Sequence, residues 1–353
     1  MSLIKDPITW ALVGGVLALL GLATGAGQLL KRQRDARFDT AVIEQFNLRV
    51  RAWWLMCSVL AAAFLLGETA TVILFFLLSF WALREFITLT PTRAADHRTL
   101  FWVFVLFTPL QYLLVAMNQY GLYSVAIPVY AFLFIPARIA LAGDYKRYLE
   151  RCAKIQAGLM ICVYCLSYAP ALLNLKIVDV PSTPVQKVEE DGSPAQPATD
   201  PMSQVERLVN DQRPADPNAR ILFFLILVVT MGDAFQYTSE KLVGRHIIAP
   251  AISPNRTWEG YAAGVACSTL FGAALSWATP FNPLQAAGMS LLITTMGFLG
   301  GLTMSAIKRD RGVQDYGTLV QGHGGVLDRI DSLCFAAPVF FHVTRYFFDL
   351  SGR

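Results

Sequence analysis

The chain has 353 residues, of which 55% are hydrophobic and only 15% are charged. A soluble domain carries about 25% charged residues, so this composition excludes an ordinary soluble enzyme and indicates a polytopic membrane protein. The net charge of +4 is modest and no soluble basic domain is present, which argues against nucleic-acid binding.

Apolar segments predict an all-α, polytopic membrane bundle of about ten transmembrane helices, because a spanning helix needs roughly 20 apolar residues. The long run at 52–89 is too long for one crossing and is divided near Gly67. Proline residues are expected to bend the spans at 100–117 and 121–141. The first-half spans are 10–30, the two halves of 52–89, 100–117, 121–141 and 155–175.

The segment 178–219 differs from the rest of the chain, since it is rich in Pro and acidic residues and can bury little. This composition predicts a flexible loop on the outer face of the membrane. It divides an N-terminal transmembrane half (1–177) from a C-terminal transmembrane half (220–353). Lys and Arg gather on the segments between spans that the positive-inside rule then places in the cytoplasm.

Four more spans are expected in the C-terminal half, at 221–235, 261–278, 284–306 and 332–348. Asp233 lies close to the expected end of the first of them. Ser253-Pro254 is typical of a helix start, with Glu259 near the first turn. A helix N-terminus there would itself attract an anion.

The segment 305–331, between the last two spans, is the densest polar run of the chain. Its carboxylates suit Mg²⁺, its basic side chains suit phosphate oxygens, and its glycines let backbone N–H groups approach an anion. The alternative interpretation is a solvated cytoplasmic loop whose charges only set topology. Its charged residues are Lys308, Arg309, Asp310, Arg311, Asp315, Asp328, Arg329 and Asp331.

This run resembles the signature of the phosphatidate cytidylyltransferases (CDP-diacylglycerol synthases), which is far more specific than a lone glycine motif. The matching residues are Ser305-x-Ile307-Lys308-Arg309, Gln314-Asp315-x-Gly317 and His323-Gly324-Gly325-x-x-Asp328-Arg329-x-Asp331. Two positions depart from the family pattern, since Gln314 replaces a Lys and Gln321 replaces a Pro.

The resemblance implies a role for each residue of the signature. Asp315 and Asp328 are expected to bind Mg²⁺, with Asp331 as the next carboxylate candidate. Lys308 and Arg309 are expected to hold triphosphate oxygens, assisted by Arg329. The residues expected to form a phosphate-binding turn are His323, Gly324 and Gly325.

A second block, 253–260, is also similar to the family, with Arg256 in place of the usual Lys. The resemblance implies that Ser253, Arg256 and Thr257 hold the lipid phosphate or the nucleotide. Asp233 is a candidate metal or ribose contact. Gln236 and Glu240 stand where the family has Ala and Gly. Arg84 and Glu85 are either an interfacial pair or part of the site, since the family places an acidic residue after aromatics there.

The reaction implied by the resemblance joins phosphatidate and CTP to give CDP-diacylglycerol and pyrophosphate. It further implies a bacterial inner-membrane protein, with CTP and bilayer phosphatidate as partners, and a homodimer. The positive-inside rule separately places Asp233, Arg256 and the segment 305–331 on the cytoplasmic side. Two alternatives stay open: a paralogue that uses another lipid phosphate acceptor, and a non-catalytic lipid-binding or transport protein. A zinc or redox role for Cys162 and Cys165 is disfavoured, because no second ligand pair accompanies them.

Overall fold

A computed structural model describes residues 57–64, 66–90, 92–177, 217–317 and 324–348, together with Trp54 and isolated residues between 14 and 28. The predicted span at 10–30 falls largely outside these residues, whereas the predicted span at 52–67 is described in part and is helical there. Within the described ranges, six helices are long and apolar enough to cross a membrane. The prediction of an all-α membrane bundle is therefore confirmed. The six helices span 68–89, 94–116, 120–140, 148–174, 218–243 and 283–310.

In the N-terminal half, α3 (Glu68–Leu89) starts directly after Gly67 and follows described helical residues at 57–64. Gly67 has φ of 102°, a backbone conformation that favours glycine, so the predicted division of the 52–89 run is placed at this residue. The remaining helices are α4 (His97–Trp102), α5 (Thr108–Ala116), α6 (Tyr120–Val125), α7 (Phe132–Ala140), α8 (Tyr148–Leu159) and α9 (Leu166–Ala171).

The predicted proline bends take the form of π-helical turns. One turn, Val103–Phe107, ends two residues before Pro109, and a second, Ala126–Ala131, contains Pro128. A proline removes one backbone N–H from the helix ladder. Next to Pro109, Thr108 Oγ1 donates to the Val103 carbonyl at 2.9 Å, which also accepts the Thr108 N–H.

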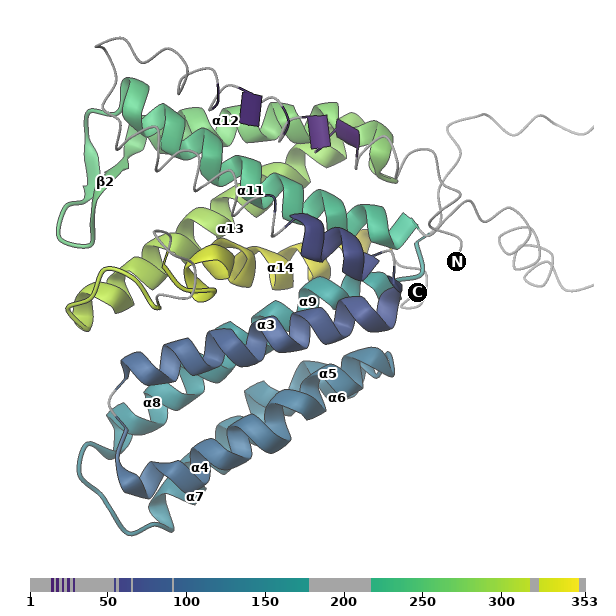
Figure 1. The fold of residues 1–353 in the computed structure, drawn as a ribbon. Coiled ribbons are helices and arrows are strands. Elements are labelled where there is room, and N and C mark those ends of the chain that lie inside the picture. Colours follow the sequence, from purple (N-terminus) through teal and green to yellow (C-terminus); the bar gives the residue numbers. More distant parts are fainter. Residues whose placement is uncertain are drawn as a thin grey trace, which may run out of the picture.

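In the described residues of the C-terminal half there are four α-helices, a short 3-10 turn (Ser276–Ala278) and a two-stranded antiparallel ribbon. Figure 1 shows the ribbon projecting beside α12 at one end of the bundle. The elements are α11 (Pro217–Val243), β1 (Ile247–Ala249), β2 (Ser253–Thr257), α12 (Trp258–Ala274), α13 (Pro283–Asp310) and α14 (Leu327–Phe348).

Two boundaries differ from the sequence-based expectations. Helix α11 continues eight residues beyond its expected end at 235, so Asp233 lies inside the helix. Ser253-Pro254 begins a strand and opens no helix, because Thr257 caps α12 by accepting the Gly260 N–H at 3.2 Å. Proline is tolerated in such a two-stranded ribbon, where its missing N–H can face away from the partner strand.

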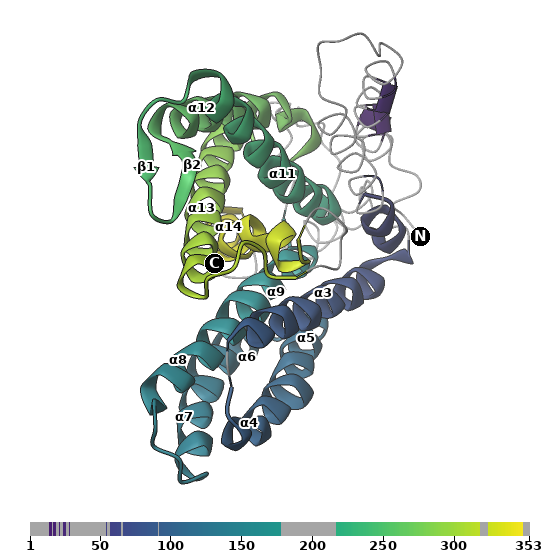
Figure 2. The ribbon, with the colours of Figure 1, turned by 60° about the vertical axis from the view of Figure 1, so that its left-hand side comes forward.

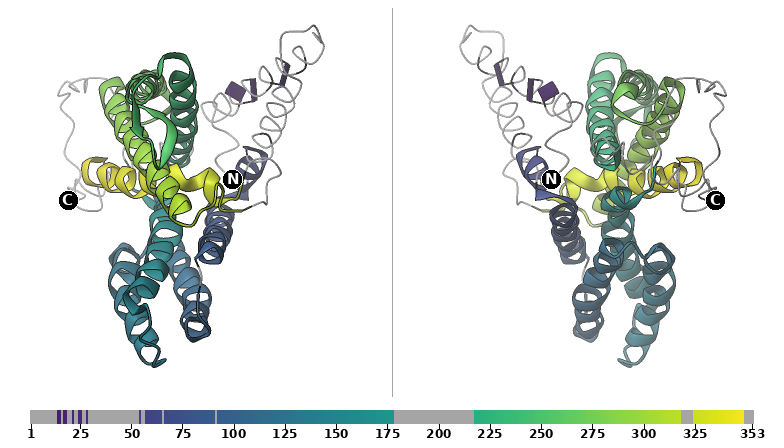
Figure 3. Two further views of the ribbon diagram at one scale, coloured as in Figure 1. Left: turned by 90° about the vertical axis from the view of Figure 1, so that its left-hand side faces the viewer. Right: turned by 90° about the vertical axis from the view of Figure 1, so that its right-hand side faces the viewer.

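Helix α14 lies between the two halves of the chain. Figures 2 and 3 show this yellow helix with the green helices α11–α13 on one side and the blue and teal helices α3–α9 on the other. It contacts α13 and α11 in its own half and α9 and α3 in the other. The start of α14 also contacts the N-terminal half, because Glu85 of α3 accepts the N–H groups of Val326 and Leu327.

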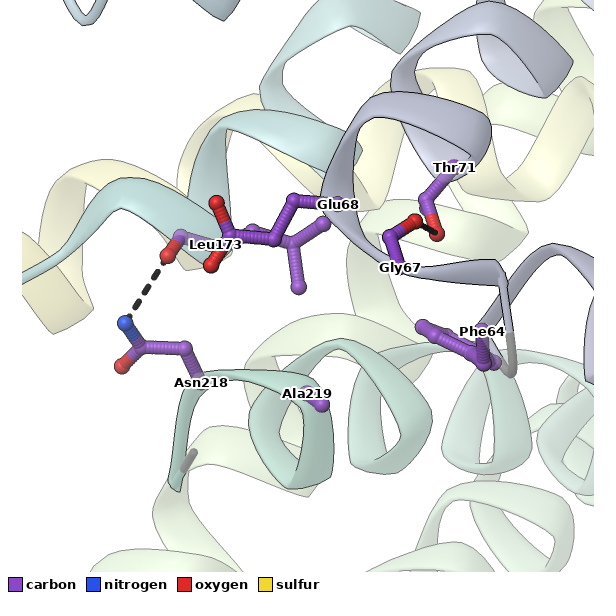
Figure 4. A pocket seen from close by; sticks show the side chains of 7 residues that line it. All are labelled: Phe64, Gly67, Glu68, Thr71, Leu173, Asn218 and Ala219. Atoms are coloured by element: carbon purple, nitrogen blue, oxygen red, sulfur yellow. Dashed lines mark hydrogen bonds between the residues drawn. The ribbon is translucent and has the colours of Figure 1, made fainter. Parts of the chain in front are cut away.

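The end of the bundle where α3 and α11 begin carries a small hollow (Figure 4). Asn218 donates from Nδ2 to the Leu173 carbonyl at 2.9 Å and to the Leu175 carbonyl at 2.6 Å. Glu85 contacts the signature, since it accepts the N–H groups of Val326 and Leu327. Glu68, which lines the hollow, is 17 positions before Glu85 on α3, roughly 26 Å along a helix. The hollow therefore lies away from the signature. Its lining residues are Phe64, Gly67, Glu68, Thr71, Leu173, Asn218 and Ala219.

The opposite end of the bundle is held by ion pairs. Arg151 of α8 donates to Asp96 and lies 3.2 Å from Asp144, which also accepts from Arg93 at 3.0 Å. Arg311, just after α13, approaches Glu150 of α8 to 4.0 Å. The signature segment is thus at the end of the molecule where charged groups of both halves meet.

Candidate active site

The candidate site begins with an ion pair between α13 and α14. Lys308 lies in the last turn of α13, and its Nζ donates to Asp328 Oδ1 at 2.8 Å. Both side chains are largely shielded, with 16% and 8% of their surface exposed. A basic residue at a helix C-terminus and an acidic one at a helix N-terminus each suit the local helix dipole.

The other oxygen of Asp328 organises the chain between the two helices. Asp328 Oδ2 accepts the N–H of Tyr316 at 2.8 Å and the N–H of Gly325 at 2.9 Å. Gly324 has φ of 78°, and a Cβ there would lie 2.7 Å from Asp328 Oδ2 and 3.2 Å from Asp315 Oδ1. Asp315 and Asp328 thus approach one another across Gly324, which has no room for a side chain.

Tyr316 anchors this connection in the bundle. Its ring is buried and stacks on Phe86 of α3 with centroids 6.3 Å apart. Its hydroxyl donates to the Met304 carbonyl at 2.9 Å, and Lys308 Nζ lies 5.4 Å from the ring centroid. The residue next to Asp315 is therefore fixed against both halves of the molecule.

A second polar cluster surrounds Arg256, which follows the ribbon turn on β2. Arg256 Nη1 donates to Gln236 Oε1 at 2.9 Å and lies 3.5 Å from Glu240 Oε1. The guanidinium also lies 5.5 Å from the Phe298 ring centroid. Gln236 and Glu240, which stand where the family has Ala and Gly, are thus the partners of Arg256.

Asp233 and Asp331 are brought together by Ser332. The Ser332 hydroxyl donates to Asp233 Oδ1 at 3.0 Å, and the Ser332 N–H donates to Asp331 Oδ1 at 2.7 Å. A Cβ on Gly301 would lie 3.4 Å from Arg256 Nη2 and 3.9 Å from Asp331 Oδ2. Arg256 and this carboxylate pair therefore face the same stretch of α13.

The remaining predicted residues are placed less centrally. Arg309 donates from Nε to the Ile252 carbonyl at 3.2 Å, in the turn of the ribbon. Thr257 uses its hydroxyl as the α12 cap, Ser253 pairs with Ala249 in the ribbon, and Arg329 lies in the first turn of α14. His323 lies outside the described residues.

Glu259 fixes the entrance to the ribbon. Its carboxylate accepts the backbone N–H groups of Arg245 at 3.1 Å and His246 at 3.0 Å, and it also pairs with the His246 ring. These contacts, the His246 side chain first, lower the pKa of Glu259 from 4.5 to about 2. The carboxylate is therefore charged at neutral pH and holds the ribbon against the start of α12.

The carboxylates at Gly324 fit a hard divalent cation in their chemistry. Mg²⁺ takes oxygen ligands and often binds through one or two carboxylates together with substrate phosphates and water. Within the described ranges, no group of three or more His, Cys, Asp and Glu side chains is placed to enclose a metal ion. Asp315 and Asp328 therefore fit a Mg²⁺ site in which two carboxylates supply part of the ligands and substrate phosphates and water would supply the rest.

The comparison with known proteins decides the family, since the profile described as the cytidylyltransferase family matches residues 47–347. The chain belongs to the cytidylyltransferase family. It is 35% identical over 335 residues to the Escherichia coli (strain K12) protein described as "Uncharacterized protein YnbB", which covers 94% of this chain and 96% of that protein.

Other members of the cytidylyltransferase family match a shorter part of the chain. A phosphatidate cytidylyltransferase of Staphylococcus aureus (strain COL) is 38% identical over 120 residues, covering 33% of this chain and 46% of that protein. One of Mycobacterium leprae (strain TN) is 38% identical over 130 residues, covering 36% and 40%. The chain therefore matches less than half the length of these two named enzymes.

Sequence reasoning did not predict the roles of four residues at the candidate site. Ser332 bridges two carboxylates, Tyr316 anchors the turn, and Gln236 and Glu240 hold Arg256. The last pair carried a signal, because both residues are polar at positions where small residues were expected. Glu85 was left with two interpretations, and its contacts now place it at the signature turn.

Proposed function

We propose that this family member makes CDP-diacylglycerol and pyrophosphate from phosphatidate and CTP at the cytoplasmic face of a bacterial inner membrane. The observation that carries the proposal is the junction of α13 and α14, where Lys308 pairs with Asp328 while Asp315 approaches across Gly324. Cations, carboxylates and backbone N–H groups at one turn are the groups that phosphoryl transfer uses.

In this proposal the residues of the turn bind and orient the nucleotide. Lys308 and Arg309 hold triphosphate oxygens, and Asp315 and Asp328 would hold Mg²⁺. When bound, the ion neutralises charge on the triphosphate and fixes its geometry. An ammonium carries three N–H donors, so Lys308 can contact phosphate while it still donates to Asp328.

The reaction itself needs little acid–base chemistry from the protein. An oxygen of the lipid phosphate attacks the α-phosphorus of CTP, a new P–O bond forms, and the bond from the α-phosphorus to the bridging oxygen breaks. Pyrophosphate leaves with that electron pair. The lipid phosphate is already an anion at neutral pH, so catalysis consists of in-line positioning and charge neutralisation.

A second candidate function keeps cytidylyl transfer and changes the lipid phosphate acceptor. Glu240 lies 3.5 Å from Arg256 Nη1, so the cation expected to hold the acceptor phosphate is partly neutralised. A lipid whose phosphorylated headgroup also carries a hydroxyl or cationic group could contact both the Arg256 guanidinium and the Glu240 carboxylate. A simple phosphate monoester could pair only with Arg256.

The deciding experiment measures CTP-dependent release of pyrophosphate by the purified protein in mixed micelles with Mg²⁺. Release that requires phosphatidate and yields CDP-diacylglycerol supports the first candidate. Release only with another phosphorylated lipid supports the second. A folded protein that releases no pyrophosphate with any acceptor refutes both, and an Asp315→Asn variant serves as the inactive control.

A further inference from the structure

We propose that Glu85 of α3 is a positioning residue: its carboxylate holds the start of α14 and the glycine turn, so that Asp315 and Asp328 meet in the geometry that binds nucleotide and metal ion. The inference rests on the proposed function and adds a role for the N-terminal half of the chain.

Glu85 makes direct contacts to the turn although it belongs to a distant helix. Its Oε1 accepts the Val326 N–H at 3.0 Å and its Oε2 accepts the Leu327 N–H at 2.8 Å. Trp81 Nε1, one turn earlier on α3, donates to Oε1 at 3.2 Å. Only 5% of Glu85 is exposed.

These contacts replace a helix cap that the local sequence lacks. The first N–H groups of a helix need acceptors, which a Ser, Thr, Asp or Asn at the preceding position usually supplies. Val326 precedes α14 and has an apolar side chain. Glu85 therefore supplies from α3 the acceptor that α14 cannot supply for itself.

The glycines of the signature fit around this carboxylate. A Cβ on Gly325 would lie 2.7 Å from Glu85 Oε1 and closer still to Oε2, and a Cβ on Gly317 would lie 2.8 Å from Oε1. Such distances are shorter than real contacts allow. Both sides of the turn thus close on Glu85, which fixes their separation.

The position of Asp328 follows from the same contacts. Gly325 donates to Asp328 Oδ2 and is packed against Glu85, while Leu327, the neighbour of Asp328, donates to Glu85. Burying a carboxylate is costly unless hydrogen bonds compensate it. The two backbone donors of Val326 and Leu327 compensate Glu85 only when the turn is in this arrangement, so its burial favours that arrangement.

The test compares Glu85→Gln with Glu68→Gln, which changes a carboxylate at the other end of α3. The amide keeps one acceptor oxygen but turns an NH₂ group toward a backbone N–H. We expect Glu85→Gln to raise the Mg²⁺ concentration for half-maximal turnover, and to lower kcat, by roughly 10–100-fold, the range seen when groups that orient metal ligands are removed. Glu68→Gln should match the wild type.

A second readout needs no turnover: the rise in melting temperature that Mg²⁺ and CTP produce without acceptor lipid. Glu85→Gln should lose most of this rise. A variant that melts lower without ligand but keeps the full rise and the wild-type Mg²⁺ midpoint would show a merely structural residue and overturn the inference.

A double-mutant cycle with Gly325→Ala tests the contact directly. Gly325→Ala alone should lose activity because its Cβ meets the Glu85 carboxylate, whereas adding it to Glu85→Ala should cost little more. If the double variant lost activity by the product of the two single-variant losses, the substitutions would be independent, and the proposed contact would be overturned. A wild-type protein without any response to Mg²⁺ and CTP overturns the proposed function together with this inference, whereas a response that Glu85→Gln retains overturns this inference alone.

Discussion

At the scale of single residues, the Lys308–Asp328 pair combines two opposing charges in a shielded place. Removing one partner of such a pair leaves the other charge poorly solvated, so each affects the other strongly. Asp328 has the greater number of contacts, since it also accepts the Tyr316 and Gly325 N–H groups. The Asp328 carboxylate therefore both holds the backbone of the turn and neutralises the Lys308 ammonium.

Asp328→Asn should lower kcat by roughly 10²–10³-fold, the scale of losing one preorganised electrostatic contact. The amide keeps the size of the side chain but loses the charge that faces Lys308 and the metal ion. Asp310→Asn is the matched control, because Asp310 is 67% exposed and pairs only with Arg311 among the ion pairs found in the described chain. Initial-rate assays of pyrophosphate release would measure both, and a fully active Asp328→Asn would contradict the metal assignment.

Glu240→Gln should lower the KM for a phosphate-monoester acceptor by roughly five- to tenfold, the effect expected from about 1 kcal/mol of charge interaction. The substitution removes the carboxylate that partly neutralises Arg256 and leaves the contact to Gln236 in place. The KM for CTP should stay unchanged, which separates this effect from a general change in the site. An unchanged acceptor KM would place Arg256 outside the acceptor site.

At the scale of elements, α11 and α12 pack unusually closely through glycines. A Cβ on Gly264 would lie 2.7 Å from the Gln236 Cα, and a Cβ on Gly260 would lie 2.8 Å from the Glu240 Cα. Because these neighbours are backbone atoms, they cannot move aside cheaply. The two large polar residues of α11 therefore depend on two glycines of α12, four positions apart.

Gly264→Ala should destabilise the protein by about 1–3 kcal/mol, as overpacking usually does, and should lower turnover because it displaces the partners of Arg256. Gly288→Ala in α13 is the control, since a Cβ there meets no atom within 4 Å. Thermal melting in detergent would compare the two. Equal melting temperatures would contradict the close packing.

The ribbon should respond to acid through Glu259. Its pKa is lowered from 4.5 to about 2 in the folded state, so its stabilising contribution is present above 4.5 and lost as the pH falls through about 2. The difference in melting temperature between the wild type and Glu259→Gln should therefore be present at pH 5 and shrink toward pH 2. A difference that persists at pH 2 would contradict the role of the charge.

The sequence predicted the apolar elements well and the polar boundaries less well, for a physical reason. The composition of long apolar runs, such as those that form α3 and α13, is enough to predict spanning helices. Residues 236–241 are mostly polar, and the sequence predicted the end of the helix at 235, whereas Gln236 and Glu240 face α12 and Arg256 and the helix continues. The ribbon at 247–257 was also missed, because Ser253-Pro254 suits a helix start as readily as an edge strand.

The candidate site was likewise predicted in part, where a local sequence pattern exists, and missed where distant residues meet. The signature and its resemblance brought Lys308, Asp315 and Asp328 to one place, as the structure has them. The contact of Glu85 with Val326 joins residues 241 positions apart, and no local pattern can reveal such a pairing. Ser332 likewise reads as an ordinary helix residue until Asp233 is brought beside it.

At the scale of the whole molecule, the two ends of the bundle differ in character. One end joins the start of α11 to Leu173 and Leu175 and thus carries both flanks of residues 178–216. The other end carries Arg93, Asp144 and Arg311. If the signature faces the cytoplasm, the residues on either side of 178–216 lie at the outer end of the bundle.

In intact cells, a cysteine at Ser193 should therefore react with a membrane-impermeant maleimide, whereas Arg311→Cys should react only after permeabilisation. Both changes would be made in a variant whose six native cysteines are replaced. Labelling of Arg311→Cys in intact cells would reverse the proposed orientation.

The cap that Glu85 provides also has a consequence for biosynthesis. The donors on Val326 and Leu327 are translated 241 and 242 residues after Glu85. At 5–20 residues per second, that interval is roughly 12–50 s. During this time α3 is present in the membrane with a carboxylate whose backbone donors do not yet exist. A ribosome-bound chain that ends before α14 should therefore be unable to bind CTP, however much of the bundle has already assembled.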